Sequence, residues 1–79
     1  MSDVKRVFGM TLRQHRTQQR RTQQEIAERC NMSLRFYQEL EAGDKQPTIT
    51  SLFQLATSLE TSPANLIEDA FTVWKAEQT

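Results

Sequence analysis

Apolar side chains recur at intervals of three and four residues along most of this 79-residue chain, which is the spacing of one face of an α-helix. Runs of alternating β-branched residues, which would indicate strands, are absent, and Gly and Pro occur only twice each. The pattern therefore predicts an all-α fold. Three stripes at helical spacing are clear. They consist of Val4, Val7, Phe8 and Leu12, continued by the polar His15; of Leu52, Leu55, Ala56 and Leu59; and of Leu66, Ile67, Ala70, Phe71 and Trp74.

Capping residues divide the chain into five predicted helices. Thr22 and Glu25 have the spacing of a capping box, in which each side chain accepts a hydrogen bond from the other's backbone amide. Ser33 is a helix-capping residue, and Gly43 is suited to a helix end. The predicted helices run from about Asp3 to Gln19, from Thr22 to about Cys30, from Ser33 to Gly43, from near Thr48 or Thr50 through Leu59, and from Ser62 with Pro63 through Trp74.

The second and third helices are each about two turns long and are joined by a tight turn at residues 31–32. So short a connection cannot fold the two helices antiparallel, and it sets them at a steep angle, as in a helix-turn-helix motif. The small Ala27 stands where two crossing helices must approach closely. In this geometry the N-terminal end of the second helix of the pair protrudes and can enter a DNA major groove.

The third helix carries an unusual mixture of side chains on its outer face. Its core-facing stripe is predicted to be Phe36, Tyr37 and Leu40, whereas Leu34, Arg35 and Gln38 point another way. Taken singly, Leu34 could pack on a neighbouring turn, Arg35 could be solvated and Gln38 could be an ordinary helix former. Taken together, they suit a surface that is covered by a partner.

Charge is balanced overall but unevenly distributed. Residues 1–35 hold eight Lys and Arg against three acids, a balance of +5, and residues 36–79 hold two against seven, a balance of −5. This dipolar arrangement is compatible with binding a polyanion by one face, and equally with chance clustering on solvated helices.

Other function classes find little support in the sequence. A single Cys cannot form an internal disulfide, and one Cys with one His gives no metal cluster, so Cys30 and His15 are interpreted as packed structural residues. We find no apolar run of membrane-spanning length, no signal-peptide core, no phosphate loop and no nucleophile with a base. We therefore expect a cytoplasmic protein that is not an enzyme, with no cofactor, no metal, no membrane contact and no small-molecule ligand.

The stretch "TQQEIAERCNMSLRFYQELEAGDKQPTITSLFQLATSLETSPANLI" resembles the XRE, or phage-repressor-like, helix-turn-helix family. The likeness runs from about Leu12 to Ile67 and implies a five-helix, lambda-repressor-like domain with its helix-turn-helix at the second and third helices. We expect a single domain over residues 1–79, with a core at about 8–68 and a C-terminal helical extension at about 69–77. Three positions depart from the family pattern: Arg20 replaces a usual Gly, and Arg21 and His15 replace apolar residues.

The resemblance also implies roles for individual residues. Leu34, Arg35 and Gln38 would contact bases in the major groove, where Arg suits guanine and Gln suits adenine. Gln23 would bind a backbone phosphate at the start of the second helix. Arg16 and Glu41 would form an internal ion pair between the first helix and the end of the third. Further contacts to the DNA backbone or groove edge are implied for Ser33, Phe36, Lys45, Thr48 and Thr50.

The C-terminal stripe predicts a dimer interface formed by Ile67, Ala70, Phe71 and Trp74, because a monomer would expose a large aromatic patch. Folding of this stripe back onto the first helix is the alternative. The leading hypothesis is a sequence-specific regulator that binds a near-palindromic site on double-stranded DNA as a homodimer. A protein-interaction module, such as an antitoxin or adaptor with the same fold, is the alternative function.

Overall fold

A computed structural model of the chain describes residues 3–78, and in these residues it contains five α-helices and no strand. The helices are α1 (Val4–Gln18), α2 (Gln23–Arg29), α3 (Leu34–Ala42), α4 (Ile49–Ser58) and α5 (Pro63–Ala76). The all-α, five-helix fold predicted from the sequence is confirmed.

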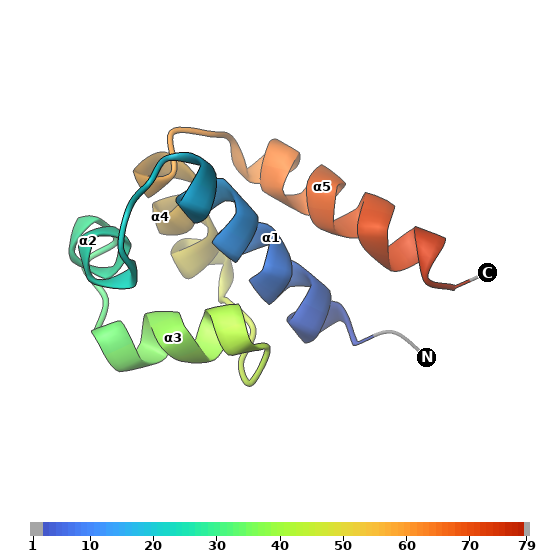
Figure 1. The fold of residues 1–79 in the computed structure, drawn as a ribbon, viewed down its shortest axis with the longest axis horizontal. Helices are drawn as coiled ribbons and strands as arrows, with labels where there is room; N and C mark the ends of the chain where they lie inside the picture. Colours follow the sequence, from blue (N-terminus) through green and yellow to red (C-terminus); the bar gives the residue numbers. More distant parts are fainter. Residues whose placement is uncertain (1–2, 79) are drawn as a thin grey trace.

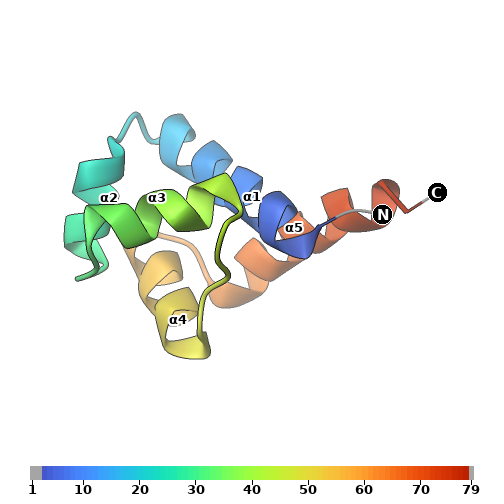
Figure 2. The same cartoon turned by 90° about the horizontal axis from the view of Figure 1, so that it is seen from below.

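Helix α1 lies between α3 and α5 and packs against both (Figure 1). Helices α1 and α5 run antiparallel. Arg6 forms an ion pair with Glu77 at 2.7 Å, and His15 Nε2 forms a hydrogen bond with Asp69 Oδ2 at 2.8 Å. Helix α2 contacts α3 and α4, and α4 also packs on α5. Figure 2 shows the same chain from below, with α3 crossing in front of α1. Helix α3 and the exposed side of α5 therefore face different directions.

Each helix begins at a side chain that accepts a hydrogen bond from a backbone amide of its own first turn, and these caps are Asp3, Thr22, Ser33, Thr48 and Ser62. The predicted capping box is confirmed, because Glu25 Oε1 accepts from the backbone amide of Thr22 at 2.9 Å while Thr22 caps Glu25. The fourth helix follows the Thr48 cap rather than starting at Thr50.

The turns between helices use left-handed backbone conformations. Gly43 ends α3 with φ of 81°, and Asn31 makes the turn between α2 and α3 with φ of 57°. Arg20 and Glu60 also have φ of 57°, although their side chains disfavour this region. Arg20 therefore adopts the left-handed conformation that a Gly at this position would adopt without strain.

The core is formed where the faces of the five helices meet. Phe36, predicted to face the core, is only partly buried, although it packs against the core. The fully buried members with the largest side chains are Tyr37, Leu12, Ile26, Leu40, Leu55, Leu59, Leu66, Val7 and Cys30. Gly9 lets α1 approach the end of α3 closely, because a Cβ there would lie 2.5 Å from the backbone oxygens of Leu40 and Glu41.

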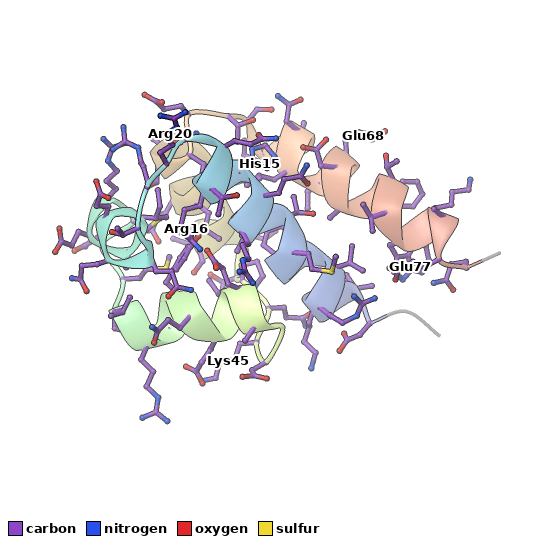
Figure 3. All side chains as sticks on the ribbon, viewed as in Figure 1. His15, Arg16, Arg20, Lys45, Glu68 and Glu77 are labelled. Atoms are coloured by element: carbon purple, nitrogen blue, oxygen red, sulfur yellow. The ribbon has the colours of Figure 1, made fainter. Side chains whose placement is uncertain are left out.

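Cys30 and His15 both pack against other parts of the chain. Cys30 is buried, its thiol lies 3.7 Å from the backbone oxygen of Gln54, and burial raises its pKa. His15 is half-buried between α1 and α5 (Figure 3). Within residues 3–78, no helix is long and apolar enough to span a membrane, and no cluster of His, Cys, Asp and Glu is suited to a metal ion.

Candidate nucleic-acid interface

The turn between α2 and α3 is tight and internally bonded. The amide of Met32 donates to the backbone oxygen of Ala27 at 3.0 Å, and the amide of Asn31 donates to the backbone oxygen of Glu28 at 3.1 Å. Ala27 is buried, which lets the two helices pack closely. In Figure 1, α2 is seen nearly end-on while α3 lies across the view, so the two helices form a steeply angled pair.

The outward face of α3 carries the three residues that the sequence assigned to the major groove. Arg35 and Gln38 are exposed and Leu34 is half-buried, whereas Tyr37 and Leu40 on the opposite face are fully buried. Within residues 3–78, no ion pair or hydrogen bond engages the guanidinium of Arg35. This face is therefore open to a partner, and Arg35 is free to bind an acceptor.

The loop from α3 to α4 lies beside this face. Lys45 is exposed, and its Nζ is 3.8 Å from the carboxylate of Glu39 on α3 (Figure 3). Thr50 is exposed in the first turn of α4. The hydroxyls of Ser33 and Thr48 accept hydrogen bonds from their own helices. Ser33 keeps an O–H that can donate elsewhere, whereas the hydroxyl of Thr48 donates to Ser51 Oγ at 3.0 Å.

An ion pair supports α3 from behind. Arg16 Nε is 2.6 Å from Glu41 Oε2 and Arg16 Nη2 is 3.1 Å from Glu41 Oε1, with side chains only 13% and 5% exposed. Arg16 Nη1 also donates to the backbone oxygen of Arg21 at 2.8 Å, so one guanidinium joins α1, the loop after it and the end of α3. Figure 3 shows Arg16 pointing from α1 toward α3.

The pKa values of this pair follow from its contacts. The hydrogen bond that Arg16 donates to Glu41 is the largest cause that raises the pKa of Arg16 above its ordinary value. Burial by itself raises the pKa of Glu41, but the hydrogen bonds that Arg16 and Gln23 donate to it, together with the positive charge of Arg16, outweigh burial, so the pKa is lowered. The pKa of Tyr37 is raised, first by burial and then by the neighbouring Glu41 carboxylate. Both members of the pair are therefore charged at neutral pH.

Gln23 has two partners inside the protein. Its Nε2 donates to Glu41 Oε1 at 3.1 Å, and its Oε1 accepts from Gln38 Nε2 at 3.3 Å. The side chain thus lies between the ion pair and the outward face of α3. The phosphate contact that the resemblance implies for Gln23 stays a prediction.

The apolar stripe of α5 is divided between two environments. Leu66 and Ala70 are buried against the rest of the chain, and Trp74 is partly buried against the core. Ile67 and Phe71 remain about half exposed, at 49% and 47%. Their side chains border an apolar hollow of about 230 Å³ between α1 and α5, whose other lining residues are Val4, Val7, Phe8, Ala70 and Trp74.

Sequence reasoning missed three features of this region. Nothing in the spacing showed that Gln23 bonds to Glu41 and Gln38, or that Glu39 pairs with Lys45. Gly9 was also overlooked, although an isolated Gly inside a helical pattern is a signal of close packing. The contact that Gly9 permits lies 31 and 32 residues away along the chain, at Leu40 and Glu41.

Comparison with known proteins identifies a helix-turn-helix family and several regulatory proteins. The family described as helix-turn-helix matches residues 12–66, which is more than half of the chain. Among curated proteins, an uncharacterized HTH-type transcriptional regulator, y4dJ from Sinorhizobium fredii, is 29% identical over 65 residues. That alignment covers 82% of this chain and 84% of the relative.

Two solved structures are similar over most of this chain. The clp gene regulator ClgR from Corynebacterium glutamicum is 27% identical with a TM-score of 0.86, and the match covers 95% of this chain and 82% of the other. The restriction-modification controller protein C.AhdI from Aeromonas hydrophila is 26% identical with a TM-score of 0.75, with coverage of 77% and 92%. The likeness to both structures extends to the sequence as well as the fold.

Proposed function

The chain belongs to the XRE-type helix-turn-helix family of transcriptional regulators, and on this premise we propose that it binds DNA sequence-specifically as a homodimer. The observation that carries the proposal is the outward face of α3, where Arg35 has no partner within residues 3–78. A guanidinium held on the protruding helix of such a pair is suited to the base edges of a major groove.

Each side chain of this face suits a different base. Arg35 has paired N–H groups that fit the O6 and N7 acceptors of guanine, and the amide of Gln38 fits the N6 and N7 atoms of adenine. Leu34 offers an apolar surface for the methyl group of thymine. Lys45, Thr48 and Thr50, on the loop and first turn beside α3, are the proposed contacts to the phosphate backbone.

The charge distribution along the chain is compatible with DNA binding. The balance of +5 over residues 1–35 falls on α1, α2 and the start of α3, while residues 36–79, which hold the rest of α3 and all of α4 and α5, have a balance of −5. A net charge of zero therefore coexists with a basic N-terminal part of the chain that can attract a polyanion.

A second copy of the chain is the proposed occupant of the apolar surface on α5. Ile67 and Phe71 are exposed beside the hollow. A second copy that covers them would remove the apolar side chain of Ile67 and the aromatic ring of Phe71 from water, which is favourable. A two-fold dimer would also place two α3 helices about 34 Å apart, one DNA turn, and would read a near-palindromic site.

Selection of bound sites from random duplex DNA, followed by titration at several salt concentrations, tests this function. We expect one recurring site with two inverted halves, and an affinity that falls steeply as salt increases. A chain that selects no sequence and instead forms a stable complex with a different protein would contradict the proposal and support the interaction-module alternative.

A further inference from the structure

A second hollow, which we call the α2–α4 hollow, lies between the C-terminal end of α2 and α4. Its volume is about 280 Å³, and it is lined by Arg29, Cys30, Asn31, Phe53, Gln54 and Thr57. None of these residues belongs to the outward face of α3, and none lines the apolar hollow beside α5. Figure 1 shows α2 and α4 at the opposite end of the molecule from the C-terminal part of α5, so this surface is separate from the proposed dimer interface.

One side of the α2–α4 hollow is an exposed apolar stripe of α4. The side chain of Phe53 is 57% exposed, and that of Ile49, one turn earlier on the same side of the helix, is 70% exposed. The core-facing side of α4 is supplied by Leu52 and Leu55, which are buried, so the ring of Phe53 takes no part in the core. An exposed aromatic ring at the edge of a hollow is suited to an apolar side chain of a binding partner.

The other side of the α2–α4 hollow carries a positive charge. Arg29 is exposed at the end of α2, and within the described part of the chain its guanidinium forms no ion pair or hydrogen bond. The acids of α2 are engaged elsewhere. Glu25 lies 3.9 Å from Arg21, and Glu28 accepts a hydrogen bond from Gln24 at 2.8 Å. Because no lining residue of the hollow is acidic, its charge is complementary to an acidic group.

The combination of an apolar stripe with a free guanidinium separates two kinds of partner. A DNA backbone would satisfy the charge of Arg29, but it would leave the side chains of Phe53 and Ile49 in water. An acidic protein segment that also carries an apolar side chain would satisfy both sides of the hollow. Its carboxylate would form a charge-assisted hydrogen bond with Arg29, and its apolar side chain would cover the ring of Phe53.

We propose that the α2–α4 hollow docks an acidic segment of a second protein, with one apolar or aromatic side chain against Phe53 and one Asp or Glu paired with Arg29. This interaction is additional to DNA binding and uses a surface to which neither the reading face nor the dimer interface contributes. Because Arg29 is exposed, its ion pair supplies specificity and a faster association rate, while contact with Phe53 supplies most of the affinity.

The test selects binders from a displayed library of random short peptides on the full chain, with the Arg29→Gln, Phe53→Ser double variant as the counter-selection. We expect the enriched peptides to share an apolar or aromatic residue beside Asp or Glu. The most enriched peptide is then synthesised and titrated by calorimetry. Phe53→Ser should weaken its binding on the order of 10- to 100-fold, whereas Phe53→Leu, which keeps an apolar side chain, should weaken it much less. Arg29→Gln should weaken it by a smaller factor and remove most of its salt dependence.

Matched variants keep the result interpretable. Arg13→Gln removes an exposed positive charge of α1 and should bind the peptide like wild type. Arg29 and Phe53 are both exposed, so their variants should melt like wild type in circular dichroism. If Phe53→Ser melts early, Arg29→Glu decides the matter, because it reverses the charge of an exposed residue and should bind the peptide no more tightly than Arg29→Gln.

Four outcomes would overturn the proposal. The first is a library in which no peptide is enriched on wild type over the double variant. The second is a set of enriched peptides that lack acidic residues or bind the variants like wild type. The third is a loss of self-association by Phe53→Ser in sedimentation, which would assign the hollow to a second copy of the chain. The fourth is a smaller salt slope of DNA binding in Arg29→Gln, which would assign the guanidinium to a phosphate.

Discussion

The guanidinium of Arg16 and the carboxylate of Glu41 meet at two points, 2.6 Å and 3.1 Å apart, across 25 residues of sequence. This contact joins α1 to the last turn of α3, and its side chains are almost completely buried. Because Arg16 also holds the loop that precedes α2, the pair sets the positions of both helices of the helix-turn-helix.

Removing either partner of this pair should strongly destabilise the chain. Arg16→Ala or Glu41→Ala leaves the other charge buried without a partner, at a cost of about 3–5 kcal/mol. A domain of this size has a total stability near the lower end of about 5–15 kcal/mol, so either variant should be largely unfolded at 37 °C by circular dichroism. A double Arg16→Met, Glu41→Leu variant is the control. It should melt at a temperature well above those of the two single Ala variants, because it leaves no isolated buried charge. Single variants that melt like wild type would contradict the role of the pair.

Acid should weaken the protein through Glu41. The folded-state pKa of Glu41 lies below its ordinary value of 4.5, so ionised Glu41 stabilises the folded chain above that pH, and the contribution is lost as pH falls through the lowered pKa. Between pH 7 and pH 3, the melting temperature of Glu41→Gln should therefore fall less than that of wild type. Glu28→Gln, which changes an exposed carboxylate, should follow the wild-type curve. Parallel curves for wild type and Glu41→Gln would exclude this linkage.

Gly9→Ala should destabilise the chain although Ala favours helices. The helix propensity gain is about 1 kcal/mol. The added Cβ would lie 2.5 Å from two backbone oxygens of α3, and overpacking of this kind costs about 1–3 kcal/mol. We expect a net loss of up to about 2 kcal/mol in denaturant unfolding. Gln14→Ala, at an exposed position of the same helix, should show no loss of stability. A Gly9→Ala variant as stable as this control would contradict the prediction, because it would show that α1 and α3 can move apart without a free-energy cost.

The proposed dimer interface predicts a difference between two exposed Phe residues. Phe71 on α5 borders the apolar hollow and is 47% exposed, while Phe53 on α4 is 57% exposed and lies away from it. Phe71→Glu should give a folded monomer in sedimentation equilibrium with much weaker operator binding, because a charge in an interface core is costly. Phe53→Glu should remain a dimer. An intact dimer in Phe71→Glu would place the interface elsewhere.

Local signals in the sequence predicted most of the helix boundaries. Thr22, Ser33 and Ser62 cap the helices that they were expected to cap, the tight turn lies at Asn31, and Gly43 ends its helix as expected. Capping depends on a few consecutive residues, so it can be read without knowing the rest of the fold. The family resemblance supplied the order of the helices, which periodicity alone does not determine.

Contacts between distant residues were harder to predict. The spacing of Leu66, Ile67, Ala70, Phe71 and Trp74 places them on one stripe, but it does not show that packing against the rest of the chain buries Leu66 and Ala70 and leaves Ile67 and Phe71 exposed. The same limit applies to Gln23, whose bonds reach 15 and 18 residues along the chain to Gln38 and Glu41. Such contacts depend on how the helices pack, which is a property of the whole fold.

Selection of sites from random duplex DNA by wild type and by Arg35→Ala tests the reading role of α3 most directly. Arg35 is exposed on the outward face, so its removal should leave the fold and the melting temperature unchanged. We expect wild type to select a near-palindromic site, and Arg35→Ala to lose about 1–3 kcal/mol of discrimination at one guanine in each half-site while keeping the remaining preferences. An Arg35→Ala variant that selects the same sites with the same discrimination, or a uniform loss at all positions, would contradict the assignment of α3 as the reading helix.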